Sequence, residues 1–115
     1  MNWLRLENNN QLTEIIKNSF DTSIKGVLLF KHSTRCSISS MALSRLERNW
    51  NFNTTEFPAY YLDLLNYRTI SNSIADTFKV EHASPQLLII KNGECIYNAS
   101  HSEISVSDVE KLFNS

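Results

Sequence analysis

The chain contains few cysteines, glycines and prolines, and no long hydrophobic run. Two residues of each of these types are spread over 115 positions. Two separated cysteines exclude a disulfide framework and a zinc ligand set, and we expect no metal site and no resident cofactor. The apolar runs fall far short of the roughly 18 residues that span a bilayer. With no repeat, low-complexity tract or linker, residues 1–115 are expected to form a single domain.

A dominant charge of either sign is also missing. The formal net charge is -1, and 20% of the residues are charged, so the broad basic surface of a nucleic-acid-binding protein is absent. The opening MNWLRLENNNQLTE lacks the basic-then-apolar layout of a signal peptide. We expect a cytoplasmic monomer that binds neither nucleic acid nor membranes.

Strand-like and helix-like patterns alternate along the chain. Asn9 or Asn10 is the candidate cap of a first helix that carries Leu12, Ile15, Ile16 and Phe20 on one face. Asn92-Gly93 is a hairpin-turn dipeptide, and Ser105 or Ser107 is the candidate cap of the last helix. Apolar spacing predicts helices over 10–20, 37–50, 70–78 and 106–113, and strands over 27–31, 58–65, 86–91 and 94–99.

The order of these elements restricts the fold. Strands joined by helices are parallel with right-handed crossovers, whereas the hairpin adds an antiparallel pair. The prediction is an α/β domain with a central mixed sheet of four strands, or five, and helices on both faces. This order matches the thioredoxin fold.

Cys36 lies between the strand predicted at 27–31 and the helix predicted at 37–50. The unpaired N–H groups and the dipole at a helix N-terminus stabilise an anion, and they lower a cysteine pKa from about 8.5 into the range of roughly 3.5–7.5. Lys31, His32 and Arg35 are cations that, near the sulfur, would add to this effect and attract an acidic thiol. The structural alternatives are a small, partly buried cysteine in a turn, an ordinary solvated loop, and a His32 that points away.

Ser39 follows Cys36 by three residues and gives the pattern C-x-x-S. One helical turn brings its hydroxyl within hydrogen-bonding reach of the sulfur, but it cannot form a disulfide. A dithiol resolves a mixed disulfide with its own second sulfur, so a protein without one needs an outside thiol. The pattern therefore indicates monothiol chemistry.

Several stretches in this order resemble one family of redox proteins. They are FKHSTRCSIS (30–39), AYYLDLL (59–65), R-x-x-S-N-x-I-A (68–75), HASPQLLIIKNGE (82–94) and NASH (98–101). Together they resemble the bacillithiol-system redox proteins, the YtxJ-like or monothiol bacilliredoxin family of the thioredoxin fold. The chain departs from the family's usual T-C-P-I-S at Ser37, which loses the pre-set helix start of a proline but keeps the N–H donors.

The resemblance implies a thiol-disulfide oxidoreductase that removes bacillithiol from client proteins through a mixed disulfide on Cys36. Bacillithiol would be the thiol co-substrate, and Ser84-Pro85 would form a cis peptide that shapes the groove; the alternative is a trans edge-strand proline. The alternative functions are a glutaredoxin-like exchanger that uses another small thiol and a non-catalytic binding module. The residues expected to bind substrate are His32, Arg35, Ser37, Ile38, Ser39, Ser84, Pro85 and His101.

Cys95 and Asn98 also bear on this site. Cys95 lies about four residues before the NASH segment, or roughly 13 Å along a strand, whereas a disulfide needs Cα atoms within about 7 Å. We expect it to pack in the core or at a sheet edge rather than to resolve a disulfide. Asn98 and His101 are expected to border the pocket, with a loop hydrogen bond as the alternative for His101.

Overall fold

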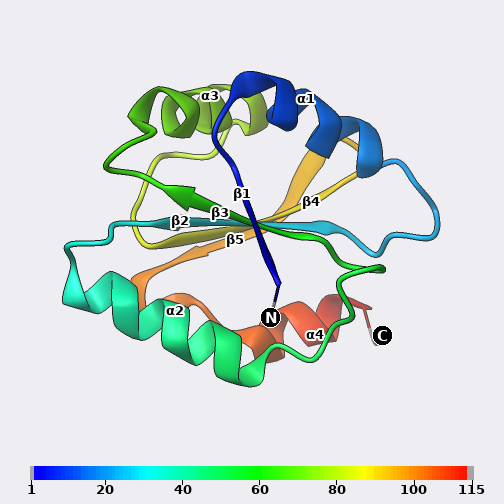
Figure 1. Cartoon of the computed structure of the whole chain (residues 1–115). Helices are drawn as coiled ribbons and strands as arrows, with labels where there is room; N and C mark the ends of the chain where they lie inside the picture. Colours follow the sequence, from blue (N-terminus) through cyan, green and yellow to red (C-terminus); the bar gives the residue numbers. More distant parts are fainter. Residues whose placement is uncertain (1, 114–115) are drawn as a thin grey trace.

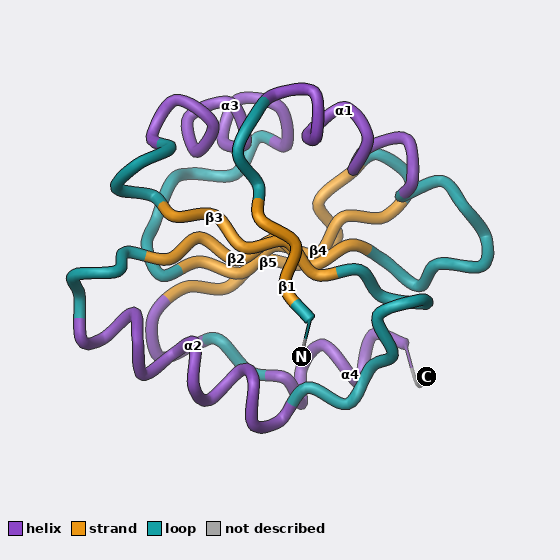
Figure 2. The backbone as a smooth tube through the Cα atoms, in the orientation of Figure 1, coloured by secondary structure: helices purple, strands orange, loops and turns teal. Residues whose placement is uncertain are grey.

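The computed structural model describes residues 2–113 and contains one five-stranded mixed sheet (Figures 1 and 2). The strand order is β1-β3-β2-β4-β5. β1, β2 and β3 are parallel, and β4 and β5 are antiparallel to their neighbours. The strands are β1 (Trp3–Arg5), β2 (Val27–His32), β3 (Ala59–Asp63), β4 (Gln86–Lys91) and β5 (Glu94–Ser100), and the helices are α1 (Asn9–Asn18), α2 (Ser37–Asn49), α3 (Arg68–Phe78), the short 3-10 helix η1 (His101–Glu103) and α4 (Val106–Phe113).

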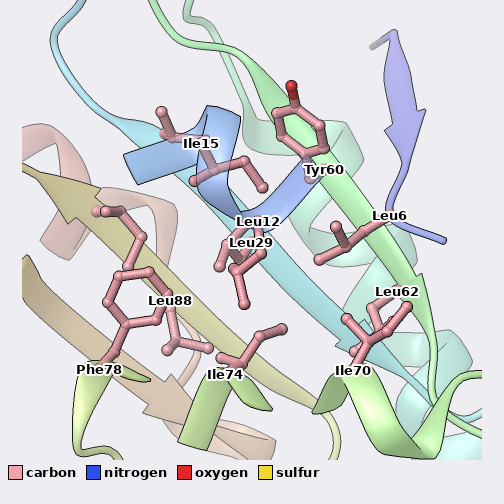
Figure 3. Close-up of a cluster of buried hydrophobic side chains, with 12 residues drawn as sticks. Leu6, Leu12, Ile15, Leu29, Tyr60, Leu62, Ile70, Ile74, Phe78 and Leu88 are labelled. Atoms are coloured by element: carbon pink, nitrogen blue, oxygen red, sulfur yellow. The ribbon is translucent and has the colours of Figure 1, made fainter. Parts of the chain in front are cut away.

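Helices cover both faces of the sheet. α1 and α3 lie on one face, and α2 and α4 lie on the other (Figure 1). Because side chains alternate along a strand, β2 contributes Val27 and Leu29 to the first face and Leu28 and Phe30 to the second. Each face therefore has its own apolar cluster, and Figure 3 shows the cluster beneath α1 and α3. This arrangement confirms the predicted α/β fold.

β2 is the central strand because it can be buried on both sides. All six of its residues are buried, including Lys31 and His32, the last two. The continuous run VLLF suits a parallel strand covered by helices on both faces. β2 therefore ends with two polar side chains in the interior, directly before the loop that leads to Cys36.

The structure corrects three details near the N-terminus. β1 is a three-residue edge strand that the sequence pattern did not reveal; it pairs with β3 through Trp3 and Ala59. The cap of α1 is Asn8 rather than Asn9 or Asn10, and Gln11 completes a capping box with it. α1 ends at Asn18, so Phe20 lies outside the helix and its side chain is 58% exposed rather than part of the predicted face.

The hairpin turn and the start of the last helix lie where the sequence predicted them, and β5 is one residue longer than predicted. Asn92 (φ 53°) and Gly93 (φ 79°) form the two-residue turn between β4 and β5. Two positive φ values in succession are what a tight hairpin turn requires. The Ser105 hydroxyl accepts a hydrogen bond from the backbone N–H of Asp108 (3.4 Å), in the first turn of α4. Among residues 2–113, no helix has the length and hydrophobicity to cross a membrane.

Candidate active site

Cys36 is the N-cap residue of α2, at the end of the loop that follows β2. Its backbone is extended (φ -105°, ψ 121°), its N–H donates to the Ser33 carbonyl (3.1 Å), and its own carbonyl accepts from the Ser40 N–H (3.1 Å). The residue is half-buried and its side chain makes no capping hydrogen bond in the described part of the chain. Backbone contacts thus hold Cys36 in place while the thiol is left free for an incoming group.

The Ser39 hydroxyl is committed to the loop and to His32. It accepts a hydrogen bond from the Ser33 N–H (3.1 Å) and lies 2.6 Å from His32 Nδ1. The backbone N–H can only donate, so the hydroxyl oxygen accepts from Ser33, while the direction of its hydrogen bond with Nδ1 depends on the His32 tautomer. The expected contact between Ser39 and the sulfur is absent from the described hydrogen bonds; Ser39 instead fastens the start of α2 to the end of β2.

His32 is a buried, neutral imidazole rather than a cation beside the sulfur. It is 4% exposed and packs near the rings of Phe30 and Tyr61. Burial lowers the pKa of His32, and the negative charges of Asp63 and Glu47 oppose this only in part. The ring therefore supports Ser39, one helical turn from Cys36.

Lys31 corrects a second expectation about cations near the sulfur. Its side chain is fully buried and belongs to the same face of β2 as Val27 and Leu29, the face covered by α1 and α3. Its ammonium lies 3.4 Å from Nδ1 of His82, and the Ser71 hydroxyl lies 3.2 Å from the same nitrogen. Burial lowers the pKa of Lys31 to about 8. Sequence reasoning missed this contact, although a lysine at the end of an apolar strand was a visible signal.

Ser84-Pro85 lies at the same edge of the sheet as the end of β2. The peptide bond between the two residues is cis, and Pro85 is buried. Gln86 follows immediately, and it pairs with Lys31 on one side and with Ser100 on the other. The Pro85 carbonyl accepts a hydrogen bond from the His101 N–H (3.2 Å). The register thus brings the ends of β2 and β5 to the proline from opposite sides.

A small hollow lies beside the first turns of α2. It has a volume of about 180 Å³, and its lining includes Ile38 and His101, two of the residues expected to bind substrate. Ile38 and Met41 are 57% and 67% exposed, so they present apolar surface on its wall. Arg45 Nη2 donates to the His101 carbonyl (3.2 Å), which ties the hollow's two walls together. Its remaining lining residues are Ala42 and Ser102, while Arg35 and Ser37 are exposed at the helix start.

Cys95 is far from this edge. It lies at the start of β5, opposite Ile90, and Ile90 pairs with Val27 at the beginning of β2. Its thiol donates to the Tyr97 carbonyl (3.2 Å), and the residue packs against the core beneath α1 and α3. Burial raises the pKa of the Cys95 thiol. The predicted packing role is confirmed.

The fold and this site together define a class of protein. A single cysteine at the N-terminus of the helix after the central strand, at the same sheet edge as the cis-proline, is the arrangement of a thioredoxin-fold thiol-disulfide oxidoreductase. The chain matches the model of the family described as "Monothiol bacilliredoxin BrxC" over residues 4–109. It belongs to this family, and thiol-disulfide exchange is its activity.

Solved structures agree with the fold. One, described as a candidate oxidoreductase with a thioredoxin fold, is 30% identical with a TM-score of 0.78, and the match covers 94% of this chain and 90% of that one. The thioredoxin of Malassezia sympodialis (Mala s 13) is 14% identical, with a TM-score of 0.71 and coverage of 98% and 89%. The thioredoxin of Trypanosoma brucei brucei is 11% identical, with a TM-score of 0.74 and coverage of 99% and 93%. These last two resemble the chain in fold alone.

Proposed function

We propose that the protein removes bacillithiol from client proteins that carry it as a mixed disulfide. The observation that carries the proposal is the partly buried Cys36 at the start of α2, in a chain of the monothiol bacilliredoxin family. Only a thiolate attacks a disulfide, and a helix N-terminus favours the anion. A single thiol suits a reaction whose product is passed on to an outside thiol.

The proposed cycle has two exchanges. The Cys36 thiolate attacks the bacillithiol sulfur of the client's mixed disulfide, a new S–S bond forms between Cys36 and bacillithiol, and the client cysteine leaves as a thiolate that takes up a proton. A second bacillithiol thiolate then attacks the bacillithiol sulfur on Cys36. Bacillithiol disulfide is released, and the Cys36 thiolate is restored. In the net reaction, the client's mixed disulfide and one free bacillithiol give the client thiol and bacillithiol disulfide, so the oxidation passes from the client cysteine to the incoming thiol.

The surroundings of Cys36 support an outside thiol as the resolving group. Ser39 stands where a dithiol protein has its second sulfur, and its hydroxyl is bonded to Ser33 and His32. Cys95 lies at the opposite end of β5 from Ser100 and His101. Neither residue offers a second sulfur at the site, so the adduct on Cys36 should persist until another thiol arrives.

The test is the transfer of bacillithiol to the reduced protein. A bacillithiolated client protein is incubated with wild type, Cys36→Ser and Cys95→Ser, and adducts are read by mass spectrometry. We expect one bacillithiol on wild type and on Cys95→Ser, released by added bacillithiol, and none on Cys36→Ser.

Other outcomes would point to the other functions. An equal rate with glutathionylated and bacillithiolated versions of the same client would contradict the choice of bacillithiol and favour a general glutaredoxin-like exchanger. No adduct from either client would refute exchange by Cys36 and favour a binding module.

A further inference from the structure

A second pocket lies on the other side of the cis-proline segment, on the face of the sheet that carries α3. We name it the α3-side pocket. It has a volume of about 440 Å³ and opens between the segment after α3 and the edge strand β5. Its lining includes Ala83, the residue directly before the cis peptide, and Ser100, the residue before His101. Its polar lining residues are Lys79, Glu81, His82, Gln86, Asn98 and Ser100.

A buried positive charge lies directly behind the exposed wall of this pocket. Lys31 is 0% exposed, and its ammonium contacts His82 Nδ1 (3.4 Å). Burial is the cause of its lowered pKa, and no carboxylate contributes to it. A buried ammonium is costly without a partner of opposite charge. The arrangement thus leaves one positive charge uncompensated, next to a pocket that is open to solvent.

The contact with Lys31 also fixes which atom His82 presents to the pocket. An ammonium can only donate, so Nδ1 of His82 accepts, and in the neutral ring the proton lies on Nε2. Burial, Lys31 and Arg68 all lower the pKa of His82, which keeps the ring neutral. His82 is exposed, and it offers an N–H donor that the ammonium behind it polarises.

The rest of the lining adds donors but little net charge. Asn98 and Ser100 lie on β5 opposite Leu88 and Gln86, and both contribute groups that can donate. The charges of Lys79 and Glu81 are of opposite sign. Gln86 is fixed by a hydrogen bond from its Nε2 to the Glu81 carbonyl (3.0 Å). The pocket therefore favours an anion near His82 through the charge of Lys31.

We propose that the α3-side pocket binds the carboxylate end of the acidic small thiol that exchanges with Cys36, with His82 as the donor and Lys31 as the charge behind it. This inference rests on the proposed function. The sulfur would lie at Cys36, and the chain of the thiol would cross the cis-proline segment into the pocket. Lys31 is a positioning residue here, because its ammonium acts through His82.

The kinetic test compares an acidic with a neutral disulfide. Rates of Cys36 adduct formation are measured with bacillithiol disulfide and with 2-hydroxyethyl disulfide. His82→Met keeps a weak sulfur acceptor for Lys31 but has no N–H to donate, and Lys31→Met removes the charge. We expect each to lower the acidic-to-neutral rate ratio about tenfold, whereas Lys111→Met, an exposed lysine on α4, leaves it unchanged. An unchanged ratio in His82→Met overturns the inference.

A binding measurement separates this inference from the proposed function. Cys36→Ser, which cannot exchange, is titrated with reduced bacillithiol while the ring nitrogen resonances of His82 are followed by NMR. A saturable shift of the His82 Nε2 resonance supports the pocket whether or not Cys36 later transfers bacillithiol. The absence of a shift at millimolar bacillithiol overturns the pocket, even if the transfer assay succeeds.

Discussion

Replacing Lys31 by methionine should make the protein more stable and less selective. Methionine has a similar length, needs no hydrogen bond and suits the apolar face that Lys31 shares with Val27 and Leu29. Removing the buried ammonium removes its desolvation cost, and His82 Nδ1 keeps the Ser71 hydroxyl as a partner (3.2 Å). The variant thus tests whether the buried charge of Lys31 lowers the free energy of unfolding.

The size of the effect follows from the pKa of Lys31. The lowering of this pKa from 10.5 to about 8 corresponds to a cost of roughly 3 kcal/mol for the charged side chain in the folded state, before solvent screening is taken into account. Because the ammonium lies just behind the exposed His82, solvent screening reduces this cost. We therefore expect the free energy of unfolding of Lys31→Met to be about 1–2 kcal/mol higher than that of wild type at pH 7. For a domain of this size the gain raises Tm by about 4–8 °C.

The stability difference between Lys31→Met and wild type should depend on pH. The folded-state pKa is the lower one, so the cost of the charged lysine is fully present below pH 8 and disappears as the pH rises toward 10.5. Thermal unfolding of wild type and Lys31→Met at pH 6 to 10 should show a constant gap up to pH 8 that narrows above it. Lys17→Met, an exposed lysine of α1, is the control. A Lys31→Met protein that is less stable at pH 7, or a gap that stays constant to pH 10, would refute the reasoning.

Two further predictions concern the contact between His32 and Ser39. Ser39→Ala leaves the buried His32 Nδ1 and the Ser33 N–H without their partner. It should lower the free energy of unfolding, measured by chemical denaturation, by about 2 kcal/mol, whereas Ser40→Ala at an exposed position should lower it by at most about 0.5 kcal/mol. Equal losses in the two variants would contradict this prediction. Because the pKa of His32 is lowered by burial, its stabilising contribution is present above its ordinary value of 6.5 and is lost as the pH falls below it. The loss of stability between pH 7.5 and 5.5 should therefore be smaller in His32→Gln than in wild type, and an identical loss would show that His32 does not titrate this way.

The fold was largely predictable because its elements carry local signals. The run VLLFK is of strand length, and Asn92-Gly93 supplies the positive φ values of the hairpin turn. β1 has no such signal: three residues carry no periodicity, and Trp3–Arg5 is a strand only because β3 offers an unpaired edge. Phe20 fits the helical spacing of the apolar residues before it, but α1 ends at Asn18 with Ser19 as its C-cap, so Phe20 is not part of the helix.

The candidate site was predictable in its reactive residue and less so in its surroundings. Cys36 follows from its place between a strand and a helix, a purely local feature. The contacts of Ser39 and Lys31 cannot be predicted from local sequence, because each side chain could point toward the sulfur or away from it. Lys31 was expected near the sulfur, yet the alternation of side chains along β2 places it on the face of the sheet that α1 and α3 cover. Its contact there, His82, is 51 residues away in the sequence.

By itself, the sequence determined the order of strands and helices, the helix start after Cys36 and the lack of a second sulfur one turn later, because backbone geometry and turn chemistry act between neighbouring residues. Only the tertiary structure decided that Ser39 bonds to His32, that Lys31 is buried behind His82, and that a polar pocket opens beside the cis-proline segment. These contacts depend on the register of β2, β4 and β5, and a shift of one residue would exchange every side chain between the two faces of the sheet.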